Sequence, residues 1–174
     1  MDDAQVFDLI TRSYPQTVRD ESHTAEQLHI IVPLGLLPDV MRFLRDNHSL
    51  AYTMLTDLTA VDYPSRTPRF DLIYILYSLE LKHRLVVKAF IQDGEKAPTM
   101  THLWASADWA ERETYDLLGI EFAEHPDLRR ILTWDNFEGH PLRKEFPLTG
   151  RSFDETFDPN SIQVVSAFQK APFC

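Results

Sequence analysis

The apolar residues of this chain recur at regular intervals as far as Gly119 and lose that regularity beyond it. Intervals of 3.6 and 2 residues are those of helices and half-buried strands, so the earlier part can build a core. Prolines interrupt the later part at positions 126, 141, 147 and 159. A long segment without a pattern of its own usually lies on something else. We therefore expect an α+β domain over residues 1–118 and an extended C-terminal arm over residues 119–174.

Three segments carry helical periodicity. Residues 3–13 and 36–47 each place apolar side chains along one side of a helix. Residues 107–118 form the third helix, with Ser106 as its expected N-cap and Gly119 as the C′ residue that ends it.

Four segments carry the alternation of strands, namely residues 27–32, 50–58, 70–79 and 85–92. Residues 80–83 are short enough for a hairpin, which makes the last two strands antiparallel. Pro64 and Pro68 forbid a continuous ladder between the second and third strands. The expected architecture is a mostly antiparallel four-stranded sheet with helices on one face.

Composition excludes several functions. Cys174 is the only cysteine, which leaves no thiolate set for an iron–sulfur cluster or a cysteine-rich zinc site. A formal charge of −10 disfavours nucleic acid and anionic lipid as partners. No apolar run reaches the roughly 20 residues of a membrane-spanning helix. The acidic start MDDAQVFDLI is unlike a signal or transit peptide, so we expect a cytoplasmic protein. No glycine-rich phosphate loop or GxSxG motif is present.

The densest set of titratable residues is ERETYDLLG, at residues 111–119. Its spacing favours a ladder of surface ion pairs that joins Asp108, Arg112 and Asp116 at intervals of four residues. The alternative is that Glu113 and Asp116 form a carboxylate pair for acid–base catalysis, which requires a cleft and a raised pKa.

Two His-Pro steps follow, in EHPDLRRIL (residues 124–132) and EGHPLRKEFP (residues 138–147). Each is followed by leucine and adjacent basic residues, a composition typical of docking segments. In the first we expect Asp127 to cap a short turn, with the arginines directed at carboxylates of this chain or of a partner. Five aromatic residues of this part cover either a partner or the chain's own surface: Trp134, Phe137, Phe146, Phe153 and Phe157. A different alternative is a small metal-dependent hydrolase in which His125 and His140 bind one metal.

Four motifs together resemble a known family. LTAVDYP (58–64), WAERETYDLLGIEF (109–122), HPDLRRIL (125–132) and GHPLRKEFPL (139–148) occur in the order and spacing of the C-type subunit of NADH:quinone oxidoreductase, the respiratory complex I family. The match is dense between residues 50 and 148 and is weaker beyond Gly150. Glu145 stands where the family usually has Asp, and Leu118 where Phe is frequent.

The resemblance implies a non-catalytic structural subunit of the peripheral arm of a membrane-bound, proton-translocating complex. It implies no cofactor in this chain, since FMN, iron–sulfur clusters and quinone belong to other subunits. The implied partners are other peripheral-arm subunits, especially the D-type subunit that contributes to the quinone site. The implied location is peripheral, on the cytoplasmic face of the cell membrane. The equivalent subunit of a related ferredoxin-dependent or hydrogenase-type membrane complex is an alternative. Carried over by position, the interface residues are His125, Pro126, Leu128, Arg129, Arg130, His140, Pro141, Leu142, Arg143, Lys144 and Phe146.

Overall fold

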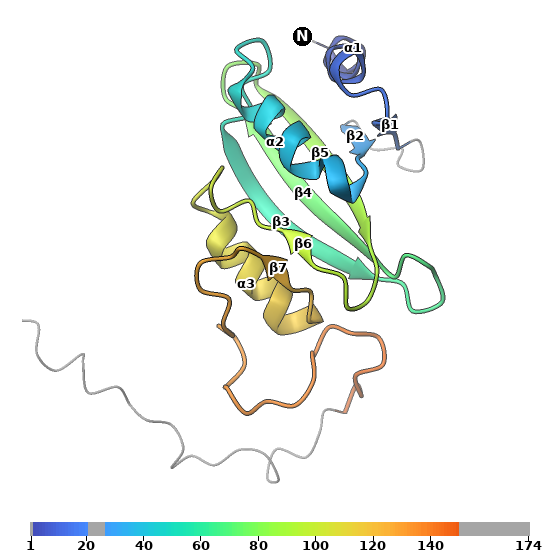
Figure 1. Ribbon diagram of the computed structural model, residues 1–174, viewed down its shortest axis with the longest axis vertical. Helices are drawn as coiled ribbons and strands as arrows, with labels where there is room; N and C mark the ends of the chain where they lie inside the picture. The colour runs from blue at the N-terminus through green and yellow to red at the C-terminus, as the bar shows by residue number, and fades with distance from the viewer. Residues whose placement is uncertain (1, 21–26, 150–174) are drawn as a thin grey trace, which may run out of the picture.

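A five-stranded sheet forms the centre of the protein in a computed structural model, which describes residues 2–20 and 27–149. The strand order is β1-β2-β5-β4-β3, and α2 and α3 lie across one face of the sheet (Figure 1). A separate pair of very short strands, β6 and β7, lies beside α3. The elements are α1 (Asp3–Ser13), β1 (Val18–Arg19), β2 (Leu28–Ile31), a 3-10 turn (Leu34–Leu36), α2 (Leu37–Asp46), β3 (Met54–Asp62), β4 (Phe70–Ser78), β5 (His83–Ile91), β6 (Ala97–Pro98), α3 (Ala107–Leu118) and β7 (Phe122–Ala123).

The α+β class is confirmed, whereas the four-stranded antiparallel sheet needs correction. The sheet has five strands and is mixed, because β2 runs parallel to β5 and pairs Leu28 with Leu85. The tight turn between β4 and β5 predicts their antiparallel pairing. The parallel pairing of β5 with β2 is not predicted in this way, because α2, β3 and β4 lie between them in the chain. The additional strand, β1, has two residues and pairs antiparallel with β2, so it is too short to show alternation in the sequence.

Strand β3 begins four residues later than the apolar pattern predicts. Leu50 and Tyr52 are fully buried, but they belong to the turn that follows α2. The amide of Tyr52 donates to the carbonyl of Leu44 at 3.0 Å, and Ala51 takes a left-handed φ of 45°. The apolar signal at residues 50–53 therefore comes from packing at a helix end, and the ladder with β4 starts at Met54.

The core lies between the sheet and its helices. Helix α2 contributes Leu37, Val40, Met41 and Leu44, all fully buried, which is the stripe that its periodicity predicts. The inner face of β4 adds four more buried side chains, namely Phe70, Leu72, Tyr74 and Leu76. Burial of each such side chain contributes roughly 1.5–3 kcal/mol, which makes this layer the main stabilising element.

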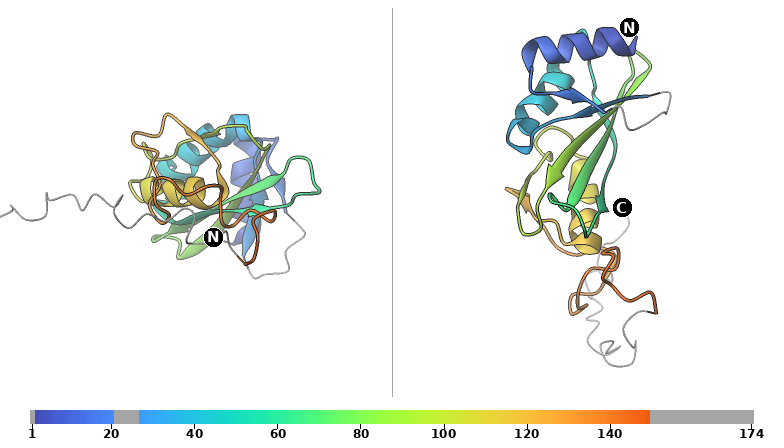
Figure 2. Two further views of the ribbon diagram at one scale, coloured as in Figure 1. Left: turned by 90° about the horizontal axis from the view of Figure 1, so that it is seen from below. Right: turned by 90° about the vertical axis from the view of Figure 1, so that its right-hand side faces the viewer.

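Helix α3 packs against β3 and spans the residues that the sequence predicts. Gly119 follows it with a φ of 74°, as expected for a C′ glycine. Ser106 is at the N-cap position but does not cap, since its hydroxyl donates to the carbonyl of Leu55 on β3 at 3.0 Å. Residues 124–149 continue as coil at the α3 end of the molecule, away from α1 (Figure 2). None of the described helices has the length and apolarity to cross a bilayer.

Candidate docking site

The two His-Pro steps occupy opposite ends of α3. We call residues 125–132 the first His-Pro segment and residues 139–148 the second. The imidazole of His125 is fully buried, and its Nδ1 accepts the amide N–H of Asp127 at 3.0 Å. The ring proton is therefore on Nε2, which lies 3.3 Å from the carbonyl oxygen of Asp108 in the first turn of α3. His125 thus holds the first segment to the start of the helix.

His140 does the same at the other end of the helix. Its Nδ1 lies 2.9 Å from the carbonyl oxygen of Asp116, so it donates to the last turn of α3. Burial lowers the pKa of His140, and this favours the neutral ring. The ring lies so close to Gly119 that an added Cβ there would be 2.5 Å from its Nε2 atom. Gly119 is therefore required both for its left-handed φ and for this contact.

A metal site shared by the two histidines is not formed. Asp108 and Asp116, to which they bind, are separated by eight residues of helix, or about 12 Å of axial rise. Among the described residues, no group of three histidine, cysteine, aspartate or glutamate side chains is placed to hold a metal. The hydrolase alternative therefore lacks its site in this part of the chain.

Asp116 is the residue that organises the first segment. Its carboxylate is fully buried and accepts the amides of Ile131, Leu132 and Thr133 at 3.0, 2.7 and 2.8 Å. It also accepts the hydroxyl of Thr133 and an N–H of Arg130, the latter at 2.7 Å. Burial alone would raise the pKa of Asp116, but these donors outweigh burial and lower the pKa to about 2.

These contacts overturn three sequence expectations. Asp116 does not belong to a surface ladder, and the buried guanidinium of Arg112 donates instead to the carbonyl of Arg129 at 3.2 Å. The Asp127 side chain does not cap the turn, because the amide of Arg129 donates to the backbone carbonyl of Asp127 at 3.1 Å and the amides of residues 131–133 donate to Asp116. A carboxylate pair of Glu113 and Asp116 also fails as an acid–base device, since Glu113 is exposed and the pKa of Asp116 is lowered.

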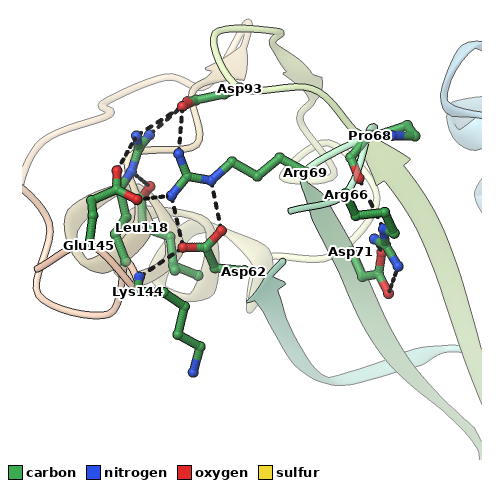
Figure 3. Close-up of polar contacts among 10 residues, drawn as sticks. Asp62, Arg66, Pro68, Arg69, Asp71, Asp93, Leu118, Lys144 and Glu145 are labelled. Carbon is green, nitrogen blue, oxygen red and sulfur yellow. Dashed lines mark hydrogen bonds and ion pairs between the residues drawn. The ribbon is translucent and has the colours of Figure 1, made fainter. Parts of the chain in front are cut away.

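The second segment is held by a network of charged groups at the ends of β3, β4 and β5 (Figure 3). Arg143 forms two hydrogen bonds with Asp93, at 2.9 and 3.1 Å. Its Nε also donates to the carbonyl of Leu118 at 2.7 Å, which ties the segment to the end of α3. The side chain of Arg143 is 18% exposed, so most of its surface is already covered by this chain.

Arg69 is the centre of the same network. It forms two hydrogen bonds with Asp62, at 2.7 and 2.9 Å, and also binds Asp93 and Glu145 (Figure 3). Asp62 in addition accepts the backbone amide of Lys144 at 2.9 Å. The Arg69 guanidinium lowers the pKa of Asp62, so the carboxylate stays ionised at neutral pH.

The arginines that sequence analysis assigns to an interface therefore differ in availability. Arg130 and Arg143 pair with carboxylates of this chain, which is one of the two arrangements that the sequence leaves open. Arg129 is 70% exposed and contacts its near neighbour Asp127. The remaining predicted interface residues divide by exposure: Pro126, Leu142 and Lys144 are exposed, Leu128, His140, Pro141 and Phe146 are partly buried, and the His125 side chain is fully buried.

The aromatic residues of the described arm pack on one another. Trp134 and Phe137 meet edge to face with ring centroids 4.9 Å apart, and Phe137 stacks on Phe146 at 5.7 Å. These three rings therefore cover one another in part, and coverage of their remaining exposed surface by a partner stays a prediction. Phe153 and Phe157 lie outside the described residues. Three leucines are left exposed on the same coil: Leu132, Leu142 and Leu148.

Fold and site together define a class. The chain is an α+β domain in which buried polar groups hold a proline-containing coil in place, with exposed leucines and an exposed arginine on that coil. Comparison with known proteins gives the family. The description "Respiratory-chain NADH dehydrogenase, 30 Kd subunit" belongs to the family model that matches residues 30–152, and the chain is a member of this family.

Two relatives illustrate the similarity. The mitochondrial NADH dehydrogenase [ubiquinone] iron-sulfur protein 3 of Candida albicans is 48% identical over 137 residues, 78% of this chain and 49% of the relative. The C subunit of the NADH-quinone oxidoreductase of Hyphomonas neptunium is 40% identical over 153 residues, 86% of this chain and 76% of the relative. The chain spans about half the length of several of its curated relatives.

A solved structure confirms the fold. A chain in the structure of the membrane-bound sulfane sulfur reductase, an archaeal respiratory membrane complex, superposes with a TM-score of 0.69. Sequence identity is 22%, and the match covers 83% of this chain and 85% of that chain. The same fold is therefore present in a protein whose sequence has diverged widely.

Proposed function

We propose that this chain is a non-catalytic, cofactor-free structural subunit in the peripheral arm of a membrane-bound, proton-translocating NADH:quinone oxidoreductase. It docks on neighbouring subunits, the quinone-site subunit foremost, and associates with the cytoplasmic face of the membrane only through them. Family membership and the names of the relatives support this proposal. The single cysteine is consistent with it, since iron–sulfur clusters need several thiolates.

The observation that supports the docking role is that buried and exposed residues of the two His-Pro segments do different things. Their buried groups fix the backbone on α3 and the sheet, while Leu132 and Leu142 are 61% and 55% exposed. Exposed apolar side chains on a backbone held in place lose little entropy when they bind a partner, which favours association. We therefore assign the docking surface to Leu132, Leu142, Leu148 and Arg129. In this proposal residues 1–118 form the domain and residues 119–174 form the docking arm.

Co-purification of the complex from detergent extracts tests the docking surface. The double change Leu132→Asp and Leu142→Asp should remove the chain from the complex without lowering its own melting temperature by more than a few degrees. Leu79→Asp is the matched control, because Leu79 is 64% exposed at the hairpin between β4 and β5, at the α1 end of the molecule. Normal incorporation of the double variant would refute the assigned surface.

A related complex is the second candidate. The fold shared with a chain of the membrane-bound sulfane sulfur reductase structure favours keeping it, because that complex is also a respiratory membrane assembly. The identity of the polypeptides that co-purify with this chain separates the two. A flavin-containing NADH-oxidising subunit among them supports the NADH complex, and a ferredoxin-dependent or hydrogenase subunit in its place supports the alternative.

A further inference from the structure

Glu111 is a fully buried carboxyl group for which sequence analysis gave no role. It lies on the inner side of α3, facing the residues that follow β6. One oxygen accepts the hydroxyl of Thr99 at 2.6 Å, and the other accepts the backbone amide of Met100 at 2.6 Å. These two hydrogen bonds join α3 to the end of the β6 strand.

The groups that face Glu111 do not include a lysine or arginine in ion-pair contact among the described residues. Asp108, from the preceding turn of α3, repels negative charge on it. The Nε2 atom of His125 lies 4.0 Å away, beyond hydrogen-bond distance, and its proton already points toward the Asp108 carbonyl. From β4, the hydroxyl of Tyr74 is buried near Glu111 and has no hydrogen-bond partner in the described part of the chain. The surroundings are therefore polar enough for a neutral acid and poor for an anion.

A pair of hydroxyls connects this carboxyl to the surface. Thr99 Oγ1 lies 3.0 Å from Thr101 Oγ1 and also accepts the backbone amide of Thr101 at 3.2 Å. Thr99 is buried, whereas Thr101 is partly exposed. A threonine hydroxyl rotates and both donates and accepts, so Thr99 can donate to an ionised Glu111 or accept from a protonated one.

We propose that Glu111 is a proton-binding site served by the hydroxyls of Thr99 and Thr101, and that its ionisation resets the hydrogen bonds between α3 and the end of β6. On ionisation the proton of Glu111 passes to Thr99, the Thr99 proton passes to Thr101, and the Thr101 proton passes to water. Each hydroxyl keeps one proton and Glu111 becomes an anion. Burial raises the pKa of Glu111 to about 7, so both forms are populated at neutral pH.

The hydrogen bonds between α3 and the end of β6 lie next to the start of the first His-Pro segment. Strand β6 pairs in parallel with β7, which is followed two residues later by His125. His125 in turn bonds to the carbonyl of Asp108, one turn before Glu111 on α3. A change of charge at Glu111 therefore acts on the point from which the arm leaves the domain.

Carbon-13 NMR of the full chain tests the proton site directly. The carboxyl resonance of Glu111, assigned by its loss in Glu111→Gln, should titrate with a midpoint near 7, and the Met100 amide proton should shift with the same midpoint. Glu113→Gln is the control, because Glu113 is exposed on the same helix and its loss should leave the Met100 titration unchanged. A Glu111 midpoint near the ordinary 4.5, or a Met100 amide that does not follow it, would overturn the proposal.

Two variants of Thr99 separate a proton relay from simple packing. Thr99→Val keeps the shape of the side chain but removes the donor to ionised Glu111, so the midpoint should rise by about one pH unit. Thr99→Ser keeps the hydroxyl and should restore the wild-type midpoint. Identical midpoints in the wild type, the Val variant and the Ser variant would show that the hydroxyl has no part in proton binding.

Discussion

The two His-Pro segments are similar in sequence and differ in how the protein uses their basic residues. In both, the histidine bonds to a backbone carbonyl of α3. The arginine four residues after His125, Arg129, is 70% exposed, whereas the arginine three residues after His140, Arg143, is 18% exposed and bonded to Asp93. The two arginines differ in exposure because Asp93, a carboxylate outside both segments, faces the second segment.

This difference has a consequence for docking. A buried arginine that already has its carboxylate gains little from a partner's acidic group, while an exposed arginine and exposed leucines gain most when a partner covers them. The second segment is thus anchored by its charges and offers Leu142 and Leu148 outward. The first offers Leu132 and Arg129, and its anchor is Asp116.

The largest expected effect comes from removing that anchor. Asp116→Ala should lower the free energy of unfolding by about 3 to 5 kcal/mol, because Arg130 and three amides of the first segment lose their acceptor. Chemical denaturation measures this. Glu113→Ala on the exposed side of the same helix should change stability by less than about 0.5 kcal/mol. Equal losses in the two variants would mean that the first segment is not held by Asp116.

Acid should weaken the same anchor in the intact chain. The pKa of Asp116 is about 2 when folded, below the roughly 3.9 of an unfolded aspartate. The native state therefore binds fewer protons, and the stabilisation of about 2.5 kcal/mol is complete above about pH 5 and is lost progressively as the pH falls to about 2 and below. Denaturation at stepped pH values should show a steeper slope in the wild type than in Asp116→Asn, where only other carboxyls of lowered pKa, such as Asp62, still contribute. An equally steep slope in the variant would assign the whole effect to those other groups.

Gly119 tests the second segment. Gly119→Ala should lower stability by about 2 kcal/mol more than Gly94→Ala, since both glycines have a positive φ but Gly119 has neighbours within 4 Å and Gly94 has none. The backbone strain is similar in the two variants and cancels in the difference, which reports the close contacts with His140 and Arg143. Thermal unfolding followed by circular dichroism gives both values. No difference between them would mean that the second segment can move away from α3 at little cost.

The smallest effects compare the two arginines. Arg143→Ala should lower stability by about 1 to 2 kcal/mol, because two hydrogen bonds to Asp93 and one to Leu118 are lost. Arg129→Ala should change it by less than about 0.5 kcal/mol, as for other exposed ion pairs. Co-purification should give the reverse order. Relative to its loss of stability, Arg129→Ala should reduce the amount of chain recovered with the complex more than Arg143→Ala does. The same order in both measurements would show that Arg129 has no role in docking.

Sequence periodicity predicted the helices well and the sheet less well. Residues 3–13 and 107–118 form helices within the expected bounds, because their apolar periodicity and breakers such as Gly119 are local signals. The pairing of β2 with β5 depends on residues far apart in the chain, such as Leu28 and Leu85, and no local pattern encodes it. Family resemblance, carried by four separate motifs, was confirmed by the family match.

The buried polar groups were the least predictable part. Asp116 has the spacing of a surface ladder, and only the fold brings the amides of residues 131–133 to it. Glu111 could have been found. It lies at helical spacing between Ala107 and Leu118, together with Thr114, in a stripe that faces inward. A carboxylate in such a stripe must be buried, which was a signal available from the sequence.

The bond from the Lys144 amide to Asp62 joins residues 82 positions apart in the chain. A polypeptide emerges from the ribosome in order, so β3, β4 and Arg69 are available long before residue 144 is made. Asp62 and Arg69 can pair at once, whereas the second segment closes onto them only after residues 139–148 have been made. A neighbouring protein that recognises the closed arrangement would consequently bind chains that already include the second segment and pass over shorter nascent ones.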